Sequence, residues 1–163
     1  MLEEYGIKLL PLKKDDLELV RFWRNSDKIK RYAKNKNYIT KETHKKWFEN
    51  LNGYYFIIEI NDKKAGLIWL KKVDDHYESG FYIYEDKYLN NIYSYKIVTI
   101  LHKFAFYDLG LNEIYCEILE TNKRAIRFNK SLGFKKVDGI KYRLTKNDFE
   151  KHLQNFSSIL EKY

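Results

Sequence analysis

Apolar residues gather in the middle of the chain in three consecutive runs. These runs are Tyr54–Ile60, Ala65–Val73 and His76–Tyr84, and they are rich in Ile, Tyr, Phe and Trp. Short segments of turn-forming residues, Asn61–Lys64 and Asp74-Asp75, separate them. Strand-forming residues interrupted in this way by Asn and Asp are typical of an antiparallel meander. The pattern therefore predicts three neighbouring strands in one sheet.

Apolar residues recur every three or four positions in five other segments, which predicts five helices. The helices are expected over residues 13–25, 41–51, 93–109, 122–132 and 146–162. Thr40 is a suitable N-cap for the second helix, because its hydroxyl can accept a first-turn N–H group. The residues expected to face the core are Leu17 and Val20 in the first helix and Ile97, Ile100, Leu101 and Phe104 in the third.

Four further apolar runs predict strands over residues 6–12, 112–119, 134–137 and 140–144. The expected order is then strand, two helices, three strands, helix, strand, helix, two strands and a last helix. This order predicts an α/β or α+β fold, a mixed sheet with helices on its faces, in a single domain over residues 1–163. The last helix has an apolar stripe that can cover either the sheet or the partner in a homodimer; the stripe consists of Phe149, Leu153, Phe156, Ile159 and Leu160.

The stretch NKRAIRFNKSLGF, residues 122–134, contains both a start and a stop signal for its helix. Asn122 can cap the first turn, and Gly133 can end the helix in a left-handed turn. Between them, Ala125, Phe128 and Leu132 recur at helical spacing. A short helix followed at once by a strand is therefore expected here.

Composition and charge restrict the function only slightly. The chain has a net charge of +8, from 31 Lys and Arg against 23 Asp and Glu. Such a balance favours an acidic partner, such as a phosphate-bearing cofactor, a nucleotide sugar, nucleic acid or a membrane surface. The alternative is compositional, because Lys is spread along the whole chain rather than concentrated in one block. We therefore expect neither a nucleic-acid nor a membrane partner from the charge.

Cysteine usage and hydropathy indicate the compartment. Cys116 is the single cysteine, so no intrachain disulfide can form, and no Cys/His spacing typical of a metal site is present. No run approaches the roughly 20 apolar residues that span a bilayer, and no apolar signal segment is seen. The sequence predicts a cytoplasmic protein without a structural metal.

The order of elements and several motifs resemble the GNAT superfamily of acyl-CoA-dependent N-acetyltransferases. The most specific is NKRAIRFNKSLGF, which looks like the family's Asn-x-x-Ala…Gly-Phe segment. The meander ending in ESGFYIY and the helix ending in HKFAFYDLGL are similar to the family's central strand and cofactor-facing helix. Within the superfamily, FWRN, THKKWF and FAFYDLGL look like the branch that acetylates nucleotide-linked aminosugars, as in pseudaminic acid biosynthesis. The ribosomal-protein N-acetyltransferases are a near neighbour of that branch.

The resemblance implies a sheet splayed between the fourth and fifth predicted strands, with acetyl-CoA as the acyl donor held in the resulting V. Asn122 would offer its amide to the pantetheine arm. A backbone N–H on the fourth strand, around Phe81 to Ile83, would stabilise the oxyanion. The pyrophosphate would lie on a loop that corresponds to Leu89, Asn90, Asn91, Ile92, Tyr93 and Ser94. Of these residues only Ser94 matches the family's (Gln/Arg)-x-x-Gly-x-(Gly/Ala) pattern, since Leu89 and Ile92 replace the first polar residue and the first glycine.

Acetyl transfer to an amine needs a proton acceptor, and Glu78 is the leading candidate. Strand alternation places His76, Glu78 and Tyr82 on one face and Phe81 on the other. The alternative is a solvent-facing Glu near a strand edge, and His76, closer to the turn, is expected to be exposed. A substrate amine of low pKa would need no strong base.

The leaving thiolate is a second concern. Many family members place a Tyr at the position of Asn129, and an amide cannot act as a phenolic acid. Tyr82 or Tyr84 is the alternative proton donor, or the thiol leaves without one. On the acceptor side the resemblance points to Arg24 and Asn25 at the end of the first helix, and to His44 and Trp47 on the second. Arg24 would take a sugar-nucleotide phosphate and Trp47 would stack on a base or sugar.

Three functions remain open from the sequence. The leading one is an N-acetyltransferase that moves an acetyl group from acetyl-CoA to a primary amine, with a nucleotide-linked aminosugar as the first choice of acceptor. The second is a degenerate GNAT-fold protein without catalysis, suggested by Ile92 and Asn129. The third is a protein N-terminal acetyltransferase of the ribosomal-protein type. Binding of acetyl-CoA separates the first from the second, and acceptor choice separates the first from the third.

Overall fold

The computed structural model describes residues 1–162, apart from the side chains of Ile159 and Lys162. Within them the chain forms one eight-stranded sheet with the strand order β1-β2-β3-β4-β5-β6-β8-β7. The strands are β1 Leu2–Glu4, β2 Ile7–Pro11, β3 Gly53–Ile60, β4 Lys63–Val73, β5 His76–Ile83, β6 Glu113–Glu117, β7 Lys135–Asp138 and β8 Lys141–Thr145. The α-helices are α1 Leu17–Asn25, α2 Asp27–Lys30, α3 Lys41–Glu49, α4 Asn91–Lys103, α5 Lys123–Ser131 and α6 Lys146–Lys162.

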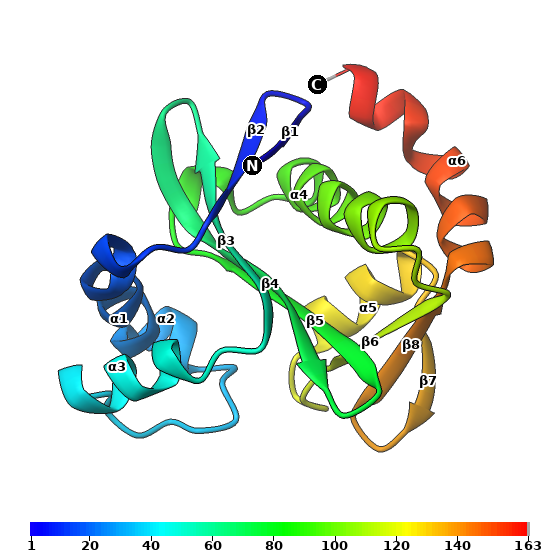
Figure 1. Ribbon diagram of the computed structural model, residues 1–163. Coiled ribbons are helices and arrows are strands. Elements are labelled where there is room, and N and C mark those ends of the chain that lie inside the picture. Colours follow the sequence, from blue (N-terminus) through cyan, green and yellow to red (C-terminus); the bar gives the residue numbers. More distant parts are fainter. Residues whose placement is uncertain (163) are drawn as a thin grey trace.

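The predicted mixed fold is confirmed, including the splay of the sheet. Neighbouring strands pair antiparallel except β5 and β6, which run parallel and pair at one position, Glu78 with Tyr115. Beyond this pair the two strands diverge, so the sheet opens into a V at its centre (Figure 1). These are the fourth and fifth strands expected from the sequence.

The helices cover the two faces of the sheet separately. Figure 1 shows α1, α2 and α3 on one side and α4, α5 and α6 on the other. The core on the α4 side is the larger, and it includes Ile97, Ile100 and Leu101 of the predicted stripe. The core on the α1 side is built on Val20, Trp23, Ile57 and Leu67. Trp23, only 1% exposed, is a core residue that the helical spacing did not single out.

The apolar stripe of α6 packs inside its own chain. Phe149, Phe156 and Leu160 are buried in the larger core, and Phe156 stacks on Tyr95 of α4 with ring centroids 4.4 Å apart. The side chain of Ile159, expected on the same stripe, lies outside the described residues. Covering the chain's own core accounts for this stripe, and the possible homodimer stays a prediction.

The boundaries of several elements differ from the prediction. The first strand is a hairpin, because Tyr5 and Gly6 both adopt positive φ, 56° and 76°, and turn β1 back onto β2. The short helix α2 was not expected. The third predicted helix does not run unbroken to residue 109: α4 ends at Lys103 and continues as a π-helical segment, Phe104–Asp108. Bulky aromatic residues at the end of the helix accompany this change.

Candidate active site

The divergence of β5 from β6 leaves backbone donors facing the V. The N–H of Tyr84 donates to the carbonyl of Ala65 on β4 at 2.7 Å. Along an antiparallel strand the peptide groups alternate in direction, so the N–H groups of Phe81 and Ile83 point away from β4. They therefore point to the side from which β6 has departed, where the sequence predicts the oxyanion donor.

A cavity of about 570 Å³ opens between the start of α4 and one side of α5. Its lining consists of Leu89, Asn90, Asn91, Tyr95, Arg124, Arg127, Phe128 and Ser131. Two guanidinium groups from α5 therefore face the loop that the sequence assigns to the pyrophosphate. Phe128 also packs against Phe81 of β5, with centroids 6.0 Å apart, which ties this cavity to the V.

The loop at the start of α4 provides backbone donors without a glycine. Asn90 is the N-cap, and its side chain accepts the N–H of Tyr93 at 3.1 Å. The N–H groups of Asn91 and Ile92, in the first turn, have no acceptor within the helix. Ile92 is helical, and none of the residues with positive φ falls in 89–94. The departure from the family's glycine pattern therefore conflicts with no backbone requirement, and the cationic cavity beside it fits a polyanionic donor.

Both asparagines of α5 are engaged in helix contacts. Asn122 is the N-cap as predicted, and its Oδ1 accepts the N–H of Ala125 at 3.2 Å. Asn129 donates from Nδ2 to the carbonyl of Ala125 at 2.8 Å. Gly133 ends the helix at a φ of 107°, and a Cβ there would lie 2.9 Å from Nδ1 of His152. The amide of Asn129 is therefore bonded within its own helix. In Asn122 only the oxygen takes part in the cap, so the capping bond does not use the NH₂ group.

Glu78 lies where β5 and β6 separate, with its side chain 18% exposed. Nε2 of His76 lies 3.2 Å from Oε2 of Glu78, and Nδ1 of His76 lies 3.4 Å from the exposed carboxylate of Asp75. The expected exposure of His76 was wrong, since its side chain is only 20% exposed and packs on Tyr115. A carboxylate, an imidazole and a second carboxylate thus form a chain from the V to solvent.

Tyr82 lies on the same face as Glu78, among Trp23 and Trp69. Its hydroxyl is buried without a hydrogen-bond partner, and burial raises its pKa well above the usual range. Phe81, its neighbour, points to the opposite face and meets α5. Tyr82 and Asn129 therefore lie on opposite faces of the sheet. The role of Tyr82 as proton donor stays a prediction.

The acceptor side of the V holds a cation among aromatic rings. The guanidinium of Arg24 lies 4.5 Å from the ring centroid of Trp47, and none of the described carboxylates pairs with it. Burial lowers the pKa of Arg24. Trp47 stacks on His44 at 4.8 Å and meets Tyr55 edge-on. Burying a guanidinium without a carboxylate partner costs free energy unless an anion pairs with it. The surroundings of Arg24 are therefore suited to an anionic group of a ligand.

His44 and Asn25 have different surroundings from each other. His44 is 1% exposed, its Nε2 has no hydrogen-bond partner, and burial together with Arg24 lowers its pKa to about 4. The alternative of a surface histidine is therefore wrong. Asn25 exchanges two hydrogen bonds with Ile39, 2.9 and 2.8 Å long, and so holds the segment after α2. We interpret Asn25 as positioning this segment.

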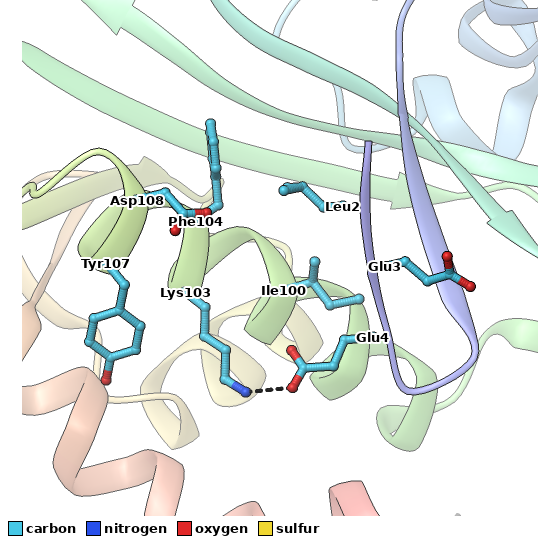
Figure 2. Close-up of a pocket in the computed structure, with 8 residues that line it drawn as sticks. All are labelled: Leu2, Glu3, Glu4, Ile100, Lys103, Phe104, Tyr107 and Asp108. Atoms are coloured by element: carbon cyan, nitrogen blue, oxygen red, sulfur yellow. Dashed lines mark hydrogen bonds and ion pairs between the residues drawn. The ribbon is translucent and has the colours of Figure 1, made fainter.

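A second, smaller hollow of about 150 Å³ lies between β1 and α4 (Figure 2). Lys103 donates there to Glu4 at 2.8 Å and to the hydroxyl of Tyr5 at 2.9 Å. Its charged groups thus satisfy one another, as Figure 2 shows for Lys103 and Glu4. The hollow lies at the other end of α4 from the larger cavity, and we assign it no chemistry.

Several residues of the site were not selected by sequence reasoning. Arg127 lies three positions after Arg124 on α5, and that spacing was a readable signal for one cationic face. The hydrogen bond of 2.9 Å between Tyr95 and Ser131 joins α4 to α5, and no local pattern announces it. Lys34 and Glu117 form an ion pair 83 positions apart, which only the fold brings together.

An open V with backbone donors, a carboxylate at its base and a cationic cavity on one side defines an acyltransferase that uses an anionic donor. The comparison with protein families agrees: residues 7–135 match the model described as Acetyltransferase (GNAT) domain. The chain belongs to this family and is an acetyl-CoA-dependent N-acetyltransferase.

Individual relatives are distant. The chain is 24% identical over 136 residues to the spermidine N(1)-acetyltransferase of Escherichia coli K12, covering 80% of this chain and 73% of that protein. Among solved structures, the spermidine N-acetyltransferase of Vibrio cholerae in complex with CoA and spermine superposes with a TM-score of 0.76 at 15% identity, covering 90% of this chain and 99% of that one. Aminoglycoside acetyltransferase AAC(6′)-Ib with ribostamycin and coenzyme A gives 0.78 at 16% identity, covering 90% and 97%.

Two further properties concern the described part of the chain. No helix within it is both long and apolar enough to cross a membrane. Nor do its His, Cys, Asp and Glu side chains form a group of three or more that could hold a metal ion.

Proposed function

We propose that this enzyme acetylates the primary amine of a small molecule that also carries an anionic group, with a nucleotide-linked aminosugar as the leading acceptor. The acetyl-CoA dependence follows from the family, and the acceptor class is our inference. The observation that supports it is Arg24, which lies over Trp47 without a carboxylate partner among the described residues. A phosphate would pair with the guanidinium, whereas the ring of Trp47 is already stacked on His44 and contacted by Arg24.

The donor would bind on the α4 and α5 side. Acetyl-CoA supplies the activated acyl group when it is bound. The first-turn N–H groups of Asn91 and Ile92 and the guanidinium groups of Arg124 and Arg127 would hold its phosphates. Asn122 has an amide NH₂ left to donate to the pantetheine arm. The donor phosphates would lie on one side of the sheet and the acceptor on the other. The acetyl thioester and the acceptor amine would then meet in the V.

The chain's own groups account for the remaining requirements of acyl transfer. Glu78, at the base of the V, would take the proton of the acceptor ammonium, and His76 and Asp75 offer a route for that proton to solvent. The N–H groups of Phe81 and Ile83 would donate to the developing oxyanion. Asn129 is bonded to Ala125, so the thiolate would leave without a proton from that position, or with one from Tyr82.

Three alternatives are weighed against particular observations. A polyamine acceptor, as in the names of two relatives, is disfavoured at the position of Arg24, because a cation would meet a desolvated cation there. A peptide N-terminus, as in the ribosomal-protein branch, would use the same base but gives Arg24 no defined partner. The degenerate alternative is weakened at Ile92, which requires no unusual backbone, while Asn129 still supports it.

Calorimetric titration with acetyl-CoA, followed by an acceptor screen, tests this proposal. We expect micromolar binding and turnover of nucleotide-linked 4-aminosugars above that of spermidine or of a peptide with a free N-terminus. Absence of binding at millimolar acetyl-CoA would contradict the enzyme and favour the degenerate scaffold. Binding with turnover of spermidine or the peptide alone would contradict the acceptor class.

A further inference from the structure

A lysine of this chain lies at the acceptor side of the V. Lys34 belongs to the segment between α2 and α3, and its Nζ donates to Oε1 of Glu117 at 2.6 Å. Glu117 is the last residue of β6, two positions after Tyr115, the residue that pairs with Glu78. Residues two apart on a strand share a face, so Glu117 and Tyr115 lie on one face of the sheet. The edge-to-face contact of Tyr115 with His76 identifies this face as the one that carries Glu78.

The segment that carries Lys34 is fixed at its far end. Arg21 donates to the hydroxyl of Tyr38 and to the carbonyl of Ile39, at 3.0 and 3.2 Å. Asn25 adds its two bonds to Ile39. The segment therefore crosses from α1 to β6 with one end anchored. This arrangement holds a primary amine close to where the acceptor amine must bind.

The carboxyl groups of Glu117 and Glu78 lie close enough for Glu78 to influence the pKa of Glu117. The hydrogen bond from Lys34 lowers the pKa of Glu117, with a smaller contribution from Glu78. Lys34 remains accessible, with its side chain 59% exposed, so it can rotate away from Glu117 toward the base of the V. An amine tethered this close reacts at a high effective concentration compared with one in solution.

We propose that Lys34 is a self-acetylation site of this enzyme, used when acetyl-CoA is bound and the acceptor is absent. The inference rests on the proposed role of Glu78 and on acetyl-CoA as donor. Glu78 takes a proton from the Lys34 ammonium, and the free amine attacks the carbonyl carbon of the thioester. The new N–C bond forms as the C–S bond breaks, the nitrogen loses its remaining extra proton to solvent, and solvent protonates the leaving thiolate. The products are Nε-acetyl-lysine at position 34 and CoA.

Acetylation would change the loop as well as the lysine. The amide product is neutral, so the ion pair with Glu117 is lost and the pKa of Glu117 rises toward its ordinary value. The segment would remain tied at Ile39 but lose its bond to β6. Self-acetylation would therefore release this segment from β6.

Peptide mass spectrometry on purified protein incubated with acetyl-CoA tests the proposal, with Lys36 as the internal comparison. Lys36 lies on the same segment and donates only to the carbonyl of Ala33, at 2.8 Å. We expect Lys34 to be acetylated about tenfold faster than Lys36, at a rate independent of protein concentration. Non-enzymatic acetylation predicts the opposite order, because the amine of Lys34 is held in an ion pair with Glu117, whereas Lys36 contacts a backbone carbonyl.

Two variants and a parallel assay make the result decisive. Glu78→Gln should abolish the preference for Lys34, and Lys36→Arg should leave the rate of Lys34 labelling unchanged. Labelling of Lys34 no faster than of Lys36, or unchanged labelling in Glu78→Gln, would overturn the proposal. Acceptor turnover is measured on the same preparation: turnover with unlabelled Lys34 rejects self-acetylation and leaves the proposed function standing, whereas loss of both rejects both.

Discussion

Single residues on the acceptor side carry unusual electrostatics. Arg24, His44 and Tyr82 are desolvated, and the latter two have buried polar atoms without partners. Isolated polar groups of this kind are costly in a folded chain and are common where a ligand completes them. We therefore expect these residues to determine acceptor specificity and Glu78 to act as the base.

Replacement of Glu78 tests the base. Glu78→Gln keeps the shape of the side chain and removes its ability to take a proton. We expect kcat/KM to fall by roughly 10²–10⁴-fold with acetyl-CoA binding unchanged by calorimetry. Glu59→Gln, a carboxylate on β3 away from the V, is the matched control. Equal activity of the two variants at all acceptor concentrations would remove Glu78 from the mechanism.

His44 gives the fold a defined pH dependence. Its pKa is about 4 in the folded state against about 6.5 when unfolded, so the unfolded chain binds the proton more readily. Stability should be constant above about pH 6.5 and fall as the pH drops from there to about 4. His102, with a pKa of about 3, acts in the same direction.

The variant His44→Phe distinguishes the contribution of His44 to the pH dependence of stability from that of His102. A phenyl ring can still stack on Trp47 but has no proton to gain. Urea unfolding between pH 7 and 4 should show a shallower loss of the free energy of unfolding in His44→Phe than in the parent protein. Identical pH profiles would show that His44 is not desolvated as described.

At the scale of elements, we propose that the start of α4 and the exposed side of α5 form the donor site together. Neither element binds phosphates by a recognisable motif. Their donors are backbone N–H groups and two arginines one turn apart. The cavity between them is the feature on which donor affinity depends.

Arg127 tests the contribution of α5. Arg127→Ala should raise the Kd for acetyl-CoA by about tenfold, as expected for loss of one charge-assisted contact, with a weaker dependence on salt. Lys130→Ala removes the same charge from the same helix outside the cavity lining and should bind normally. A Kd that rises equally in both variants would indicate a general charge effect instead of a site.

Ile92 tests whether the missing glycine matters. Because Ile92 is already helical, Ile92→Gly should leave the Kd for acetyl-CoA within about twofold. The same change should lower the free energy of unfolding by roughly 0.5–1 kcal/mol, since glycine is a poor helix former. A large gain in affinity would show that the side chain of Ile92 obstructs the donor.

The sequence predicted the elements well and the site unevenly. Caps such as Thr40, Asn90 and Asn122 are local interactions, and the first and third of them were readable from residue type and spacing. The burial of His44 was not, because it depends on how α3 packs against α1 and the sheet. The ion pair of Lys34 with Glu117 depends on the path of an irregular segment, which has no periodicity to read.

The molecule as a whole separates donor and acceptor by its sheet. The groups proposed to bind the donor phosphates lie with α4 and α5. Arg24, which has no carboxylate partner among the described residues, lies with α1 and α3, and the V between β5 and β6 lies between the two sides (Figure 1). Each side presents a cation, in keeping with the net charge of +8. This charge distribution favours an anionic donor and an anionic acceptor that meet at the carboxylate of Glu78.

The most direct test of this account compares acceptors in the parent enzyme and in Arg24→Met, which keeps an apolar stem over Trp47. The measurement is kcat/KM for a nucleotide-linked 4-aminosugar and for spermidine, at saturating acetyl-CoA. The account predicts that the parent enzyme prefers the aminosugar and that Arg24→Met loses about tenfold or more for it while its value for spermidine does not fall. A parent enzyme that prefers spermidine, or a variant that loses activity equally on both acceptors, would contradict it.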